Sequence, residues 1–155
     1  MASALTSAKL SSELKVGIWD HDPGTASAIV ATSDGSTKLY LDGSLYTDFM
    51  FLVNTSVLSG TGVTLVELVA ADDTAMSTNL TVIVSSGAVA ADAIADYVVV
   101  ECTADQIAQL SAASGYSLRY VSVRITCNNS GDEAKVTYIV RPIVATSGLT
   151  ATYIS

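Results

Sequence analysis

Residues that carry out chemistry are scarce in this chain. Its 155 residues include one histidine, two cysteines and one tryptophan. His21 is therefore the one imidazole that could act as a general base or activate a thiol. The sequence also lacks a Gly-x-Ser-x-Gly elbow and a glycine-rich loop followed by lysine. We predict a protein that is not an enzyme and that binds no cofactor.

Positive charge is also in short supply, with seven Lys and Arg against fifteen Asp and Glu. No Lys, Arg or His occurs at all from residue 39 to residue 118. Four of the cations lie close together in the sequence: Arg119, Arg124, Lys135 and Arg141. We expect them to pair across strands with Asp132 and Glu133 or to line a solvated face. Because phosphate backbones are bound by Lys and Arg, direct binding of nucleic acid is not predicted.

Long apolar segments are missing as well. The apolar runs stay well short of the roughly 20 residues that a membrane-spanning helix needs. Residues 1–10 lack a charged start followed by a continuous apolar stretch, so they do not read as a secretory signal. We expect synthesis in a cytoplasm and no membrane partner.

Two clusters of acidic residues could suggest a metal site or a catalytic pair, but both occur in predicted turns. His21 lies between Asp20 and Asp22, just before a Pro-Gly pair. Adjacent residues of an extended chain point in opposite directions, so we favour a solvated turn over a metal site. Asp72 and Asp73 are adjacent in a turn, which favours solvation over a glycosidase pair facing across a cleft. No metal site is predicted.

What the chain does contain is β-strand pattern. Residues 119–126 alternate, with Val121, Val123 and Ile125 on one face and Tyr120, Ser122, Arg124 and Thr126 on the other. This period of two is typical of a half-buried antiparallel strand. A second strand is predicted at 97–102.

The two cysteines fall in or beside these strands. Cys127 is in register with the apolar face of the strand before it, and Cys102 ends the strand at 97–102. Two buried free thiols are therefore the leading interpretation. A disulfide between neighbouring strands is the alternative, because sequence does not give the distance between the Cα atoms.

Two Asp-Gly pairs separate the early strands. Asp34-Gly35 and Asp42-Gly43 divide three apolar segments, at 28–32, 37–41 and 45–53. Asp-Gly between apolar strands favours a type I′ hairpin turn, so we predict a meander.

The middle of the chain continues in the same way. The Gly-Thr-Gly sequence at 60–62 separates residues 49–53 from 63–69, which predicts another strand pair. A further strand is predicted at 79–85. The small residues of 87–95 favour a loop over a helical turn.

One short helix interrupts the strands. Thr103 and Gln106 have the spacing of a capping box, in which each side chain bonds the backbone of the other residue. The predicted helix runs from 104 to 110 and points Ile107 and Leu110 inward. The final strand is predicted at 135–144.

The complete set of elements predicts an all-β fold: an antiparallel β-sandwich, jelly-roll-like, with one short helix between strands. Sandwich, jelly roll and barrel share these strands, so the strand order stays open. We expect a flexible N-terminal arm at 1–15, a single β-sandwich domain at 16–145 and a C-terminal tail at 146–155.

Aromatic residues are the remaining candidates for a binding site. Tyr120 and Tyr138 fall on the last two strands, which we expect to pair and to carry an outer aromatic row. Packing or a subunit interface is favoured over a carbohydrate platform, which would need these tyrosines or Trp19 exposed.

The segment from Asp96 to Arg124 resembles a known family. Three motifs carry the resemblance: Asp96-Tyr97-Val98-Val99-Val100-Glu101-Cys102-Thr103-Ala104-Asp105-Gln106, Gly115-Tyr116 and Arg119-Tyr120-Val121-Ser122-Val123-Arg124. They are similar to the second half of the small head decoration (cement) proteins of tailed bacteriophages. The resemblance covers roughly the last third of the chain and its motifs are structural. It implies a β-sandwich that oligomerises on the capsid exterior and clamps neighbouring major capsid subunits.

The expected function is therefore that of a structural virion protein which decorates and stabilises a phage capsid. Its partners would be the major capsid protein and further copies of itself, with a trimer favoured over a dimer. The residues expected at these contacts are Leu5, Leu10, Leu14, Trp19, Tyr120 and Tyr138. The alternative is a carbohydrate- or receptor-binding β-sandwich of a virion fibre or a cell surface.

Overall fold

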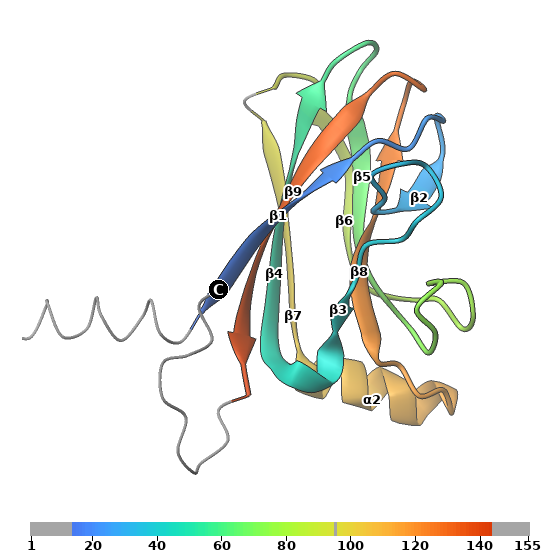
Figure 1. Cartoon of the computed structure of the whole chain (residues 1–155), viewed down its shortest axis with the longest axis vertical. Helices are drawn as coiled ribbons and strands as arrows, with labels where there is room; N and C mark the ends of the chain where they lie inside the picture. Colours follow the sequence, from blue (N-terminus) through green and yellow to red (C-terminus); the bar gives the residue numbers. More distant parts are fainter. Residues whose placement is uncertain (1–13, 95, 144–155) are drawn as a thin grey trace, which may run out of the picture.

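Two antiparallel sheets packed face to face make up the protein (Figure 1). The computed structural model describes residues 14–94 and 96–143. The elements, in chain order, are β1 (Lys15–His21), β2 (Ala28–Val30), β3 (Leu41–Asp42), η1 (Gly43–Leu45), β4 (Tyr46–Val57), β5 (Val63–Ala71), β6 (Thr81–Ala91), β7 (Tyr97–Thr103), α2 (Ala104–Ser114), β8 (Tyr120–Cys127) and β9 (Glu133–Pro142).

The strand order is that of a jelly roll. Sheet A has the order β1-β9-β4-β7, and sheet B has the order β2-β8-β5-β6, with β3 also paired to β8. The pairs are nested, because β1 pairs with β9, β2 and β3 with β8, β4 with β7, and β5 with β6. Successive segments of the chain thus cross between the sheets in a double-sheet antiparallel fold. The predicted all-β sandwich with one short helix is confirmed.

The core lies between the sheets and follows from the alternation of the strands. From sheet B, the inward face of β8 contributes Val121, Val123 and Ile125, all fully buried. From sheet A, Phe49 and Phe51 of β4 lie in the same cluster. The predicted faces of β8 are confirmed because each inward residue enters this single core.

Helix α2 begins at the predicted capping box. The amide of Gln106 donates to Thr103 Oγ1 at 3.3 Å, and the amide of Thr103 donates to Gln106 Oε1 at 2.9 Å. Ile107 is buried and Leu110 packs against the core. The helix continues four residues beyond the predicted end, to Ser114, and stops at Gly115, whose φ of 76° suits a left-handed cap.

The predicted meander at the two Asp-Gly pairs is wrong. The chain turns back at Asp34-Gly35, but it forms only an isolated bridge between Thr32 and Lys38. At the second pair, Asp42 caps η1 by accepting from the Ser44 amide, and the chain crosses from sheet B to sheet A. A capped 3₁₀ turn replaces the expected hairpin there because the Asp42 side chain binds the backbone ahead of it.

The predicted pairing of residues 49–53 with 63–69 is also wrong, because β4 and β5 belong to different sheets. Asp132, on the β8–β9 turn, holds the crossing loop. Its Oδ1 accepts from the amides of Ser59 and Gly60 at 2.7 and 2.8 Å, and its Oδ2 accepts from Gly62 and Asn129 at 3.0 and 3.1 Å. This fully buried carboxylate therefore fixes both loops at one end of the sandwich.

The structure also corrects the predicted loop at 87–95 and the predicted end of the N-terminal arm. Residues 87–91, predicted as a loop, continue strand β6, and Gly87 has a φ of 69° beside a register shift in its pairing with β5. The expected arm at 1–15 overlaps β1, which begins at Lys15. The rest of the arm, residues 1–13, and the tail at 146–155 lie outside the described residues.

Candidate protein-binding surface

The outer face of sheet A, which points away from the core, carries a continuous apolar surface. Strand register aligns Val16, Ile139 and Met50 in one row across β1, β9 and β4, and this row ends at Glu101 on β7. The next row aligns Ile18, Thr137, Leu52 and Val99, and so reaches β7. We name this surface the sheet A patch; its apolar residues are Val16, Ile18, Met50, Leu52, Val99 and Ile139.

The sheet A patch is open to solvent over the described residues. Ile18 is 64% exposed, Val16 60% and Val99 45%. Single exposed apolar residues are ordinary, but a contiguous patch across four strands is typical of an interaction site.

The outer face of sheet B differs, because the chain covers it itself. Val69 and Ala71 of β5 are fully buried there against Val30 and Met76. Leu80 packs against the same small cluster. Of the two outer faces, sheet A is the one that the described loops leave free.

Ion pairs border the sheet A patch at both ends. Lys135 Nζ lies 3.7 Å from Asp20 Oδ1 at one end, and Arg141 Nη1 lies 3.3 Å from Asp48 Oδ2 at the other. Each pair joins residues directly opposite one another on adjacent strands. Such exposed pairs add little stability, but they neutralise the rim of the patch.

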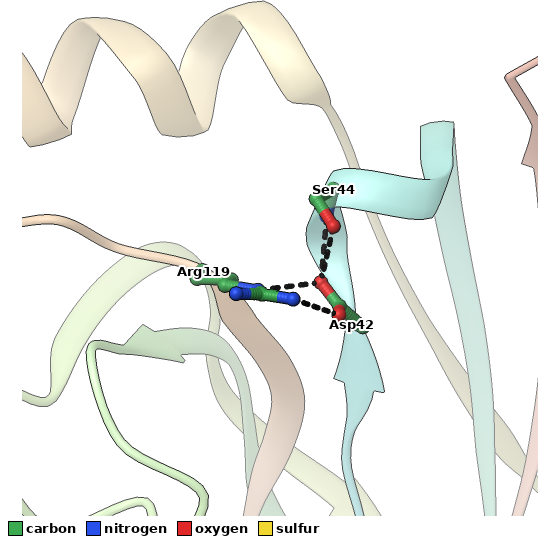
Figure 2. Close-up of polar contacts among 3 residues, drawn as sticks. All are labelled: Asp42, Ser44 and Arg119. Atoms are coloured by element: carbon green, nitrogen blue, oxygen red, sulfur yellow. Dashed lines mark hydrogen bonds and ion pairs between the residues drawn. The ribbon is translucent and has the colours of Figure 1, made fainter.

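The other two clustered cations are also paired. Arg124 contacts Glu67 at 2.7 Å across β8 and β5. Arg119 Nε and Nη2 donate to Asp42 at 3.0 and 2.6 Å, and Figure 2 shows the guanidinium facing both carboxylate oxygens. The expectation of cross-strand pairs is confirmed, but the predicted partners Asp132 and Glu133 were wrong.

The pair in Figure 2 has a structural role. Asp42 Oδ1 also accepts from the hydroxyl and amide of Ser44, at 2.7 and 3.0 Å. The Arg119 hydrogen bonds, followed by those of Ser44, hold the pKa of Asp42 well below its usual range. Asp42 therefore stays ionised and ties β3 and η1 to the start of β8.

The residues predicted from the sequence as contacts do not gather on one surface. Trp19 points into the sandwich, with its ring centroid 5.0 Å from Tyr138 and 5.9 Å from Phe51. Leu14 is half-buried just before β1. Leu5 and Leu10 lie outside the described residues.

The predicted outer row of Tyr120 and Tyr138 does not form. Their strands, β8 and β9, lie in different sheets. Tyr138 faces the core, and Tyr120 packs on the outer face of sheet B with its ring 5.2 Å from Tyr40. The cause is the β8–β9 turn, which carries the chain across the sandwich instead of folding it into a hairpin.

His21 is buried, which corrects the prediction of a solvated turn. It ends β1 and is 1% exposed. Its Nδ1 accepts from the Thr32 amide at 3.2 Å, while its Nε2 has no hydrogen-bond partner. Burial, and to a lesser degree Lys38, lowers the pKa of His21 to about 4, against an opposing effect of Asp22. A neutral, enclosed imidazole is a core residue at neutral pH.

The carboxylates are held by the chain's own donors. Asp73 accepts from the hydroxyls and amides of Ser77 and Thr78, and these bonds, with the Thr78 hydroxyl first, lower its pKa to about 2. Within residues 14–94 and 96–143, no three His, Cys, Asp or Glu residues are placed to hold a metal ion.

The cysteines are free and buried, as predicted. Cys102 is in β7 of sheet A and Cys127 is in β8 of sheet B. Burial raises the pKa of the two thiols to about 12 and about 11. Such thiols are poor nucleophiles, since the thiolate is the reactive form.

The helix in the described part of the chain is too short and too polar to cross a membrane. Neither a protein-family model nor a curated protein matches this sequence.

Proposed function

We propose that this chain is a structural virion protein that binds the outside of a bacteriophage capsid and bridges major capsid subunits. The observation that carries the proposal is the sheet A patch, an apolar surface across four strands that the described loops leave open. The resemblance of residues 96–124 to head decoration proteins supplies the type of partner. The jelly roll by itself favours no function, because capsid domains, lectins and cupins share it.

The chemistry of the patch supports a protein partner. Its centre is apolar, the two cations at its rim are paired with carboxylates, and Glu101 beside it is acidic, so it offers no cationic track for a phosphate backbone. Burying its exposed Val and Ile side chains against another protein would stabilise the complex by about 25 cal/mol for each Å² of apolar surface removed from water.

The size of the patch supports binding to a repeated lattice. Four strands at about 4.8 Å spacing and three residues of length give a face of about 200 Å². Stable interfaces bury about 800 Å² on each partner. One copy would therefore bind weakly, and stable occupancy would come from several linked copies that engage neighbouring subunits together.

The carbohydrate alternative needs Trp19 or a pair of tyrosines as an exposed stacking surface. Trp19 packs on Phe51 and Tyr138, which does not favour this alternative. Absence of binding on a glycan array is the result we expect.

Substituting Ile18 tests the proposal. Ile18→Lys places a charge at the centre of an apolar contact, so its affinity for shells of the major capsid protein should fall at least about tenfold. The measurement is co-sedimentation of the full chain with purified shells across a range of chain concentrations.

Leu45→Lys is the matched control, because Leu45 is also an exposed apolar residue, at 55%, but lies in η1 outside the patch. It should bind shells like the unmodified chain. Equal binding by both variants, or no binding by the unmodified chain, would contradict the proposal.

A further inference from the structure

One side of the sandwich has a hollow between two edge strands. β6 ends the order of sheet B and β7 ends the order of sheet A, so each has one edge without a strand partner among the described residues. A hollow of about 630 Å³ lies between them, lined by Ser86 and residues 89–91 on β6, by Asp96 just before β7 and by residues 97–99 on β7. The backbone edges of two strands thus border one elongated space.

These edges carry few of the usual protections against pairing. β6 has neither a charged residue nor a proline along its eleven residues, and its only protection of this kind is the set of three register shifts in its pairing with β5. β7 begins with four uncharged residues, Tyr97 to Val100. Edge strands are normally guarded by charge, proline or short length. β1, at the other edge of sheet A, carries Lys15 and Asp20, and β2 has only three residues.

We propose that this hollow binds residues 149–154 of a second copy of the chain, which add as an extended strand. The segment Leu149-Thr150-Ala151-Thr152-Tyr153 alternates apolar residues with threonine, the pattern of a strand with two different faces. It carries no charge, which matches the uncharged lining of β6. Main-chain hydrogen bonds to the free edge would supply affinity, and the small side chains of Ala90 and Ala91 leave room for it.

The geometry favours a second copy over the same chain. β9 ends at Pro142, opposite Tyr46, at the α2 end of sheet A, whereas the hollow lies at the level where Tyr97 pairs with Asn54 (Figure 1). The two levels are about 26 Å apart along the strands and about 10 Å apart across them. Residues 144–148 span at most about 18 Å, so only the last residues of a chain's own tail would arrive there.

This contact would build a cyclic oligomer. The hollow and the end of β9 are different surfaces, so each copy would give its tail to one neighbour and receive a tail from the other. Closed rings of this kind would also link several sheet A patches together. The inference rests on β6 and β7 and holds whether or not the partner of the patch is a capsid.

Blocking the hollow should abolish the oligomer. Ala90→Lys introduces a long charged side chain at an exposed position of the hollow. By multi-angle light scattering, the unmodified full chain should be an oligomer and Ala90→Lys a monomer of unchanged circular dichroism. Ser117→Lys, at an exposed site before β8, should leave the oligomer intact. A monomeric unmodified chain, or an oligomeric Ala90→Lys chain, would overturn the inference.

Disulfide trapping identifies the two surfaces. A chain with Ala90→Cys is mixed with a chain carrying Thr152→Cys and oxidised, and a covalent dimer of the two different chains is expected. Cys102 and Cys127 are buried, so they should not react. A third sample is a chain that carries both substitutions. If a disulfide forms only within that chain and not between copies, the tail binds its own copy and the inference is wrong. Ile18→Lys should still form the oligomer, so failure of capsid binding and failure of strand exchange give different results.

Discussion

Replacing Asp132 with alanine should lower the free energy of unfolding by about 3–5 kcal/mol. The Asp132 carboxylate is fully buried and accepts four backbone hydrogen bonds, from Ser59, Gly60, Gly62 and Asn129. Alanine would leave all four amides without their acceptor and would release the two loops from one another. Urea denaturation at pH 7, with the m-value compared between variants, measures the change.

Two further variants separate charge from shape. Asp132→Asn keeps the shape but turns an NH₂ group toward two N–H donors, so it should be nearly as destabilising as alanine. Asp73→Ala also removes a carboxylate bound by amides and hydroxyls, but in an exposed loop where water can replace it, so it should cost far less. Equal stability of the Asp132 and Asp73 alanine variants would contradict the role assigned to Asp132.

Acid should weaken the hydrogen bonds of Asp132 only below the usual pKa of a carboxyl. Burial alone would raise the pKa of Asp132, but the four backbone N–H groups outweigh it and lower the pKa below the usual 3.8. A carboxyl with a lowered folded pKa stabilises the protein above its unfolded pKa and stops doing so as the pH falls through its folded pKa. The contribution of Asp132 is therefore complete at neutral pH and is lost only in strong acid.

Hydrogen bonds from the chain's own hydroxyls and amides to its carboxylates explain how a chain with so few cations tolerates a net charge of −8. Asp34 accepts from the amides and hydroxyls of Ser36 and Thr37, as Asp73 does from Ser77 and Thr78. The Ser and Thr that give the sequence its hydroxyl-rich character thus act as donors in place of Lys and Arg. The cations are free to pair across strands, as Arg124 does with Glu67.

Local signals were readable from the sequence. The alternation of β8 fixed its buried face, and the spacing of Thr103 and Gln106 located the start of α2. Both depend on neighbours within a few residues, so no knowledge of distant contacts was needed. The end of α2 was harder to predict, because Ala112 and Ala113 extend the helix but do not continue its pattern of buried apolar residues.

The points where the chain crosses from one sheet to the other could not be predicted from the sequence. Asp42-Gly43 and the Gly-Thr-Gly at 60–62 look like hairpin turns because the same residue types serve both purposes. What decides between them lies far away in sequence: Arg119 binds Asp42, and Asp132 binds the loop at 59–62. A jelly roll pairs its first strand with its last, so most of its register depends on such distant partners.

The candidate surface was missed for a related reason. Tyr120 and Tyr138 drew attention as aromatics, although their side chains belong to opposite sheets. A signal for the sheet A patch was present in β4, where Phe49, Phe51 and Val53 alternate with Met50 and Leu52. Five consecutive apolar residues in an antiparallel strand indicate that its outer face is apolar too. Which neighbours extend that face could not be known without the strand order.

Lowering the pH from 7 to 5 should destabilise the protein by about 2 kcal/mol through His21 alone, rising to about 3 kcal/mol near pH 4. The pKa of His21 is lowered from 6.5 to about 4, chiefly by burial. Between these values the unfolded chain binds a proton that the folded chain does not, so stability falls as the pH falls through this window. Above pH 6.5 the contribution is complete. Urea denaturation at intervals of half a pH unit measures the slope.

His21→Gln should remove most of this slope while keeping an acceptor for the Thr32 amide, which now donates to Nδ1 at 3.2 Å. The charged neighbours that act on the imidazole are Lys38 and Asp22, and His21→Gln leaves both in place. Carboxylates such as Asp73 and Asp132 have lowered pKa values and act below about pH 4, outside the window. An unchanged slope between pH 7 and 5 in His21→Gln would show that another group is responsible. If the slope disappears, protonation of His21, the buried end of β1, is what destabilises the protein between pH 7 and 5.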